Sequence, residues 1–150
     1  MTEGKHNEDA LPIEIQSNQA EFDDKKGIVT YQGNVIMKQG NRYLSATKLI
    51  IARDNHGKIE SMQAMGAPAY FYVRPEPEKP PIHGQANTLY YFPKQDKLLL
   101  IDEAELIQNE DTVQGDHLIY FISTHVLSSL PVPGKNTTVI LKPQTKSLTP

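Results

Sequence analysis

Residues 31–40 read YQGNVIMKQG, and this stretch carries the pattern that decides the fold. Every second position from residue 29 is apolar or small: Val29, Tyr31, Gly33, Val35 and Met37. Polar side chains fill most of the positions between them. Strict alternation is typical of a β-strand with one buried face, because successive side chains point to opposite sides of a sheet. The stretch therefore predicts an amphipathic strand with a glycine at its middle.

The same pattern returns in LIDEAELIQN, at residues 100–109. Its inward positions are Leu98, Leu100, Asp102, Ala104 and Leu106, so a carboxylate interrupts an otherwise apolar face. The strand that follows each copy also agrees. SATKLII (45–51) places Leu49 and Ile51 on one face, and QGDHLIY (114–120) places Leu118 and Tyr120 there. Two related halves are therefore predicted.

A shorter repeat lies inside the long one. A small residue is expected to open a strand, and an apolar residue follows five positions later, in the pairs Ser17 and Phe22, Ala46 and Ile51, Gly84 and Leu89, and Gly115 and Tyr120. Polar turn segments follow at DDKKG (23–27), RDNHGK (53–58), PKQDK (93–97) and, less obviously, STH (123–125). Four hairpin-like units predict an all-β protein of many antiparallel strands, as a sandwich or jelly roll.

The chain is expected to form one domain over residues 11–142, with flexible tails at 1–10 and 143–150. The Pro-rich segment RPEPEKPP (74–81) is expected to be a stiff connection between the halves. Residues 1–10 are polar and show no signal peptide. No apolar run approaches the ~20 residues that span a bilayer.

The sequence offers no recognisable reactive site. It has no Cys, so disulfides and thiolate metal sites are excluded, and its five His residues lack metal-ligand spacing. Nucleophile elbow, P-loop and dinucleotide motifs are missing. A net charge of −3 argues against broad nucleic-acid binding. We therefore predict no enzymatic activity, no catalytic residue, no cofactor, no metal and no nucleic-acid partner.

Charge is distributed unevenly along the chain. Residues 25–58 carry seven Lys or Arg against one acid, whereas residues 96–116 carry seven acids against one Lys. Solvated faces account for most such runs. Two further interpretations stay open: the basic part binds an anion, or the two parts attract each other between molecules.

Five motifs in order carry a family resemblance. GNVIMKQG (33–40), LSATKLII (44–51), MGAPAYFY (65–72), IHGQANTLYY (82–91) and VQGDHLIYF (113–121) resemble the LptA/OstA family of lipopolysaccharide transport. The likeness runs from about residue 11 to residue 142. The second copy departs from the family, because it has IDEAEL (101–106) where the family often keeps Thr-Gly-Asn.

The resemblance implies a twisted, V-shaped open antiparallel β-jelly roll of the OstA type. It also implies a periplasmic location and a lipopolysaccharide-binding role in outer-membrane biogenesis of Gram-negative bacteria. Family members bind lipid A in an apolar interior and bridge the inner-membrane component LptC to the N-terminal domain of LptD. They stack head to tail, and the strands expected at the two edges are PIEIQ (12–16) and TTVILK (137–142).

Alternating apolar residues are the candidates for a lipid-binding groove, because each buried CH₂ of an acyl chain gains about 0.8 kcal/mol. The candidates are Ile13, Ile15, Phe22, Tyr31, Val35, Met37, Ile51, Phe71, Leu89, Tyr91, Leu100, Leu106 and Tyr120. Arg53 and Lys58, beside a turn, are candidates for a phosphate-binding rim. The same apolar residues also suit a closed core, and the sequence leaves both alternatives open.

Two other functions fit the same pattern. One is a non-catalytic β-sandwich scaffold that binds only protein. The other is an LptC-like component of the same pathway, which would normally begin with a transmembrane helix that this sequence does not show.

Overall fold

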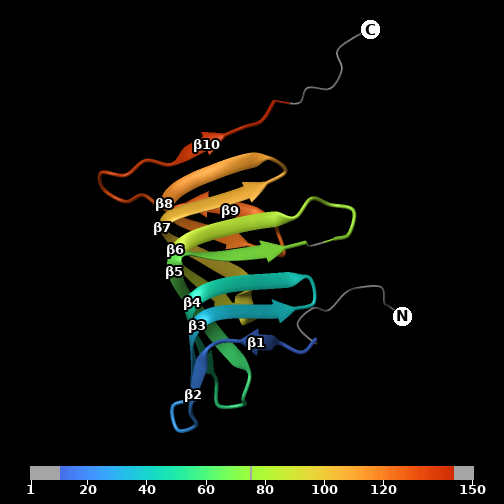
Figure 1. The fold of residues 1–150 in the computed structure, drawn as a ribbon. Helices are drawn as coiled ribbons and strands as arrows, with labels where there is room; N and C mark the ends of the chain where they lie inside the picture. Colours follow the sequence, from blue (N-terminus) through green and yellow to red (C-terminus); the bar gives the residue numbers. More distant parts are fainter. Residues whose placement is uncertain (1–10, 75, 144–150) are drawn as a thin grey trace.

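The computed structural model describes residues 11–74 and 76–143, and within them β-strands are the main secondary structure (Figure 1). The elements, in order, are β1 (Glu14–Gln16), β2 (Gln19–Asp23), β3 (Ile28–Gln39), β4 (Arg42–Arg53), β5 (Ile59–Val73), β6 (Ile82–Phe92), the short 3₁₀ helix η2 (Pro93–Gln95), β7 (Lys97–Gln108), β8 (Asp111–Phe121), β9 (Val126–Ser129) and β10 (Thr138–Ile140).

The strands form one antiparallel sheet in which each long strand pairs with the next along the chain. The strand order is β1-β3-β4-β5-β6-β7-β8-β10, and β2 also pairs with β3 while β9 also pairs with β8. The predicted all-β, open antiparallel fold is confirmed. The predicted edge strands are confirmed as well, because β1 and β10 end this order.

Each long strand bends near its middle. The pairing register shifts between Gln32 and Val35, between Ser45 and Lys48, and at the equivalent points of the later pairs. Such β-bulges bend a strand and increase its twist. Every long strand therefore contributes one part to each of two half-sheets that face each other across the interior, which is the V-shaped arrangement predicted.

The two half-sheets are defined by the bulges. The first half-sheet contains β2, residues 28–32, 48–53, 59–65, 88–92, 97–101 and 117–121, and β9. The second half-sheet contains β1, residues 35–39, 42–45, 69–73, 82–85, 104–108 and 111–115, and β10. Figure 1 shows the second half-sheet in front, with the fainter strands of the first behind it.

The bend explains the carboxylate in the second copy of the repeat. In the first copy, Gly33 (φ 87°) and Asn34 (φ 49°) have positive φ at the bulge of β3. Asp102 (φ 74°) and Glu103 (φ 55°) adopt the same conformation in β7. The second copy therefore keeps the bend without glycine. Asp102 belongs to the bulge rather than to the inward face, and it is exposed to solvent.

Small residues line the inside of the bend. Ala69, Ala86 and Ala104 are almost fully buried, and Ala46 packs against the same core. The prediction that a small residue opens each strand is wrong, because Ala46, Gly84 and Gly115 lie inside their strands. Short side chains are needed there because the two half-sheets approach each other most closely at the bend.

The predicted turns join neighbouring strands. Residues 24–27, 54–58, 93–96 and 122–125 connect β2 to β3, β4 to β5, β6 to β7 and β8 to β9. The Pro-rich segment joins the two sequence halves that carry the repeat, but these halves are not separated in space. It lies between β5 and β6, which pair directly, so it is a hairpin loop. The tails were predicted at 1–10 and 143–150, and apart from Pro143 these residues lie outside the described residues.

Candidate functional site: an apolar interior with two mouths

Three rows of side chains line the interior from one end of the sheet to the other. The first half-sheet carries row A and row B, and the second half-sheet carries row C; each row follows directly paired residues across the strands. Row A is Phe22, Val29, Ile51, Met62, Tyr91, Leu98, Tyr120 and Leu127. Row B is Ala20, Tyr31, Leu49, Ala64, Leu89, Leu100, Leu118 and Ser129. Row C is Ile15, Met37, Leu44, Phe71, Gly84, Leu106, Val113 and Val139.

The sequence-predicted groove residues fall on these rows with two exceptions. Ile13 precedes β1 and packs against the core from that end, and Val35 is buried beside the bend. The rows also contain residues that the prediction missed, above all Met62 and Leu44. Met62 was missed because the segment before it in β5 does not alternate clearly in sequence.

The middle of the interior is a packed core. Nine of the predicted groove residues are at most 9% exposed: Val35, Met37, Ile51, Phe71, Leu89, Tyr91, Leu100, Leu106 and Tyr120. Of the two alternatives that the sequence left open, the closed core describes this middle section. The space that an acyl chain would need is found at the ends of the rows instead.

Row A is exposed at its β2 end and row C at its β10 end, whereas Leu127 and Ile15, at the opposite ends, pack partly buried against the core. Phe22 is 69% exposed although it pairs with the buried Val29 and shares its face of the sheet. Phe22 is exposed because β2 is an edge strand. It therefore lies at the open end of the interior, which we call a mouth, and not in the buried part of the predicted groove. At the other end Val139 is 54% exposed while its partner Val113 packs on the core.

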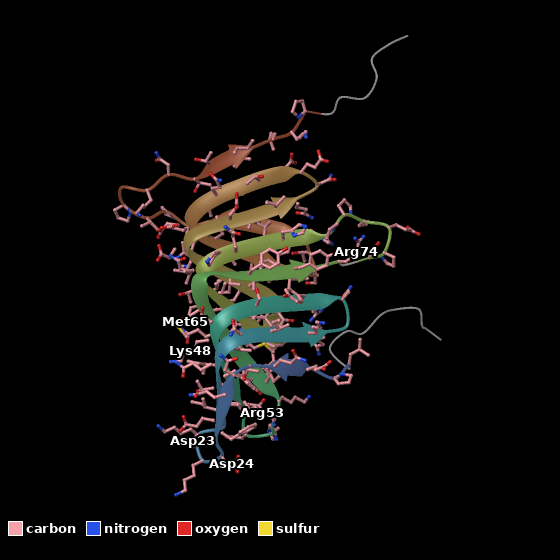
Figure 2. The ribbon with its side chains drawn as sticks, in the orientation of Figure 1. Asp23, Asp24, Lys48, Arg53, Met65 and Arg74 are labelled. Carbon is pink, nitrogen blue, oxygen red and sulfur yellow. The ribbon has the colours of Figure 1, made fainter. Side chains whose placement is uncertain are left out.

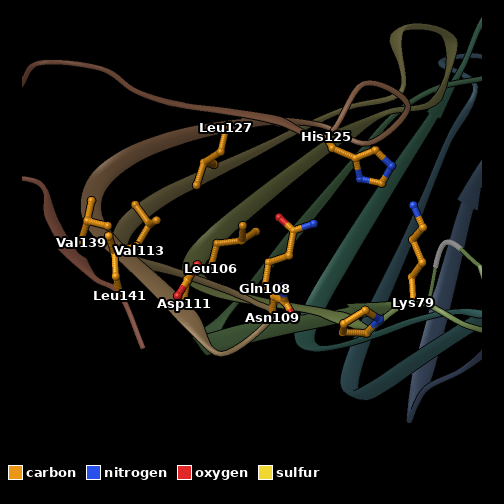
Figure 3. A pocket seen from close by; sticks show the side chains of 11 residues that line it. Lys79, Leu106, Gln108, Asn109, Asp111, Val113, His125, Leu127, Val139 and Leu141 are labelled. Atoms are coloured by element: carbon orange, nitrogen blue, oxygen red, sulfur yellow. The ribbon is translucent and has the colours of Figure 1, made fainter. Parts of the chain in front are cut away.

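A cavity of about 510 Å³ opens at the β9–β10 end (Figure 3). Figure 3 shows Leu106, Val113 and Leu127 around this space, together with the polar side chains of Gln108 and His125. A second cavity of about 420 Å³ opens at the β1 end and is lined by Ile13, Ile59, Met62 and Tyr91 together with polar groups. Both volumes lie within the range of small-molecule sites.

Polar contacts connect the half-sheets near each cavity. Arg42 Nη1, in the second half-sheet, donates to the hydroxyl of Tyr91 in the first at 2.8 Å. The Tyr120 hydroxyl lies 3.3 Å from His125 Nδ1. Burial raises the pKa of Tyr120, while its hydrogen bond with Gln108, from the second half-sheet, acts in the opposite direction. These contacts hold the two walls together beside the apolar rows.

The predicted phosphate rim lies at the β4–β5 turn. Arg53 and Lys58 are both exposed, and Lys58 lines the 420 Å³ cavity. Figure 2 shows Arg53 at the end of the molecule that carries the β2–β3 turn, and the Arg53 backbone N–H donates to Gly27 O at 2.9 Å. Burial raises the pKa of Tyr31, and the charge of Arg53 opposes that rise. Arg53 is therefore near the N-terminal part of row B.

A carboxylate organises the same turn. Asp54 Oδ1 accepts the backbone N–H groups of His56 and Lys58, and its Oδ2 pairs with the ammonium group of Lys94. The hydrogen bond from Lys94, followed by that from Lys58, lowers the pKa of Asp54 from 3.8 to about 2. Lys94 also lines the 420 Å³ cavity. The sequence prediction missed Lys94, because only the fold brings its turn beside that of Asp54.

The described residues hold no group of three or more His, Cys, Asp or Glu side chains arranged for a metal ion. None of the helical structure in residues 11–74 and 76–143 is long and apolar enough to cross a membrane. The chemistry available at both mouths is thus apolar contact flanked by cations and hydrogen-bonding groups.

The comparisons with known proteins agree with this geometry. A family model described as LptA/(LptD N-terminal domain) LPS transport protein matches residues 14–126. The chain belongs to this family of lipopolysaccharide transport proteins. The match covers every strand from β1 to β8 and the first residue of β9.

Individual relatives extend the comparison over most of the chain. The lipopolysaccharide export system protein LptH of Pseudomonas aeruginosa is 32% identical over 127 residues, which are 85% of this chain and 73% of that protein. LptA of Escherichia coli K12 is 32% identical over 134 residues, 88% of this chain and 71% of LptA. The crystal structure of LptH, named as the LptA-homologous periplasmic component of the transport device, superposes with a TM-score of 0.84 at 27% identity, over 91% of this chain and 99% of the other. The predicted family and its link to lipopolysaccharide transport are confirmed.

Proposed function

We propose that this protein is a non-catalytic periplasmic carrier of lipopolysaccharide, which binds the acyl chains of lipid A in its interior. The observation that carries the proposal is the continuity of rows A and C. Both rows run from one edge of the sheet to the other, and each stays exposed at one end, row A at Phe22 and row C at Val139. An ordinary closed sandwich would cover such ends.

Apolar contact is sufficient for this role. At about 0.8 kcal/mol for each buried CH₂ group, a few partly inserted acyl chains give substantial affinity without any reactive group. The exposed cations Arg53 and Lys58 would then face the phosphate groups of lipid A, since guanidinium and ammonium groups form strong charge-assisted hydrogen bonds with phosphate. This proposal keeps both residues as the rim of the site.

We also propose that the two ends of the sheet dock with further sheets of the same kind. The edges β1 and β10 belong to one half-sheet, and β2 and β9 belong to the other. A second copy placed head to tail can therefore extend both half-sheets at once, through exposed strand edges. The basic segment 25–58 and the acidic segment 96–116 favour this order. LptC and the N-terminal domain of LptD are proposed to take the outer positions of such a bridge.

The experiment that tests lipid binding compares the two faces of β8. Val113 lines the 510 Å³ cavity, whereas Ile119 lies on the opposite face, and both are half-buried. Val113→Asp places a charge beside the acyl chains and should reduce binding of purified lipid A at least tenfold, because a charge loses its hydration there. Ile119→Asp is the matched control and should bind as the wild type does.

Native mass spectrometry after mixing with lipid A gives the readout. A wild-type protein that gains lipid mass supports the carrier. A wild-type protein that keeps its apo mass at saturating lipid contradicts the proposal and favours the protein-binding scaffold. Equal loss of binding in both folded variants would show that the cavity at β9 and β10 is not the lipid site.

A further inference from the structure

Packed side chains separate the two end cavities of the interior. The 420 Å³ cavity adjoins β1 and the end of β3, and the 510 Å³ cavity adjoins β7, β8 and β10. A void of only about 40 Å³ adjoins the 420 Å³ cavity, with which it shares Met62 and Tyr91, and its lining also includes Met37 and Phe71. An engineered cavity of ~150 Å³ holds one benzene ring. The central void is therefore too small for an acyl chain.

The side chain that fills the centre is Phe71. It lies in row C between Leu44 and Gly84, and it is 4% exposed. Its ring leans over Gly84 so closely that a Cβ atom at position 84 would come within 1.9 Å of the ring. Gly84 is the one member of row C without a side chain. Its missing side chain forms a notch, and the ring of Phe71 occupies that notch.

Two methionine side chains lie beside the Phe71 ring. Met37 and Met62 line the same void, and methionine side chains adapt to new shapes because they are unbranched and have several rotatable bonds. Val73 and Leu44 hold the backbone of the region within paired strands. A rearrangement at the centre therefore involves side chains and leaves the sheet intact.

We propose that Phe71 is a gate residue: an acyl chain connects the two end cavities only when the Phe71 ring leaves its notch over Gly84. This inference rests on the proposed lipid-carrying function and adds the position at which the cargo is admitted to the middle of the protein. In the closed state each mouth holds only the end of a chain. In the open state rows A and C form one continuous surface.

Phenylalanine labelled with ¹⁹F gives a direct test, because the chain has only four Phe residues. Lipid A is titrated into the labelled full-length protein, and single Phe→Leu variants assign the signals. We expect the Phe71 signal to shift by more than its linewidth on loading. Phe121, which lies on the outer face of β8, is the internal control and should stay in place.

Kinetics give the second test. Stopped-flow binding of a fluorescent long-chain fatty acid should be about tenfold faster for Phe71→Leu, which empties part of the notch. Ile119→Val is the control, since it also shortens an apolar side chain but lies on the face of β8 that points away from the interior. In the double variant Phe71→Leu/Gly84→Ala, the added methyl group refills the notch and should return the rate toward that of the wild type.

The possible outcomes distinguish the proposed gating role of Phe71 from the proposed lipid-carrying function. A wild-type protein that binds neither lipid A nor the fatty acid overturns the carrier and the gate together. A wild-type protein that binds lipid while the Phe71 signal stays fixed, or while Phe71→Leu binds at the wild-type rate, overturns the gate alone. If Phe71→Leu fails to fold, the ¹⁹F titration of the wild type still decides, with Phe71 assigned by elimination from the other three variants.

Discussion

Replacing Phe22 by Ser should weaken head-to-tail assembly. A Phe side chain buries about 200 Å² when it is enclosed. Phe22 is 69% exposed, so roughly 140 Å² remains to be covered by a second copy. At about 25 cal/mol per Å² the upper limit is about 3.5 kcal/mol. Because binding also orders side chains, we expect about 2 kcal/mol, which is a roughly 30-fold rise in the dissociation constant.

Sedimentation velocity over a wide concentration range measures this change. Phe121→Ser is the matched control, because it removes the same side chain from the outer face of β8, one strand in from the edge. The control should assemble as the wild type does. The reasoning is refuted if the wild type stays monomeric at high concentration, if Phe22→Ser assembles with the wild-type constant, or if both variants are weakened equally.

Three further predictions concern the bend and the rim. Gly33→Ala should lower the free energy of unfolding in urea by about 1–2 kcal/mol, since φ at this position is 87° and a Cβ atom there would lie 2.6 Å from the Asn18 side chain; an unchanged midpoint would contradict this. NMR should show the Asp54 carboxyl titrating near pH 2, and Lys94→Ala should move its pKa back toward 3.8. Because folding lowers this pKa, the stability that Asp54 adds is present above about pH 4 and is lost as the pH falls toward 2; a titration near 3.8 in the wild type would rule it out. Arg53→Gln/Lys58→Gln should weaken lipid A binding about tenfold at low salt and leave dephosphorylated lipid A unaffected; an equal loss for both lipids would argue against a phosphate rim.

Alternation of apolar and polar residues predicted the long strands well, because these strands bury one face of each half-sheet between the two edges. The turns were predicted for a similar reason, since Gly, Asp and Lys cluster where the chain reverses. The bulges were not predictable in the same way. Asp102 reads as an inward residue only if β7 is straight, and the one extra residue at the bulge, where Asp102 and Glu103 have positive φ, turns it outward.

The sequence predicted which side chains face the interior, but not whether that interior is open or closely packed. Sequence patterns indicate which side chains face the interior, and Met37, Phe71 and Tyr91 do so. They do not indicate how far apart the two walls lie, because that distance depends on contacts between strands distant in sequence. Arg42 illustrates the limit, since its bond to Tyr91 joins residues 49 positions apart and across both half-sheets.

Because the long strands are bent, a protein of this fold can become longer or shorter by whole hairpins. Because each long strand serves both walls, adding one hairpin lengthens row A, row B and row C together, by about 4.8 Å for each strand. The cross-section and the closed bend stay the same, and the edge strands at both ends keep their docking partners. Duplicating or deleting a hairpin therefore changes the length of the sheet while the packing of the interior stays the same.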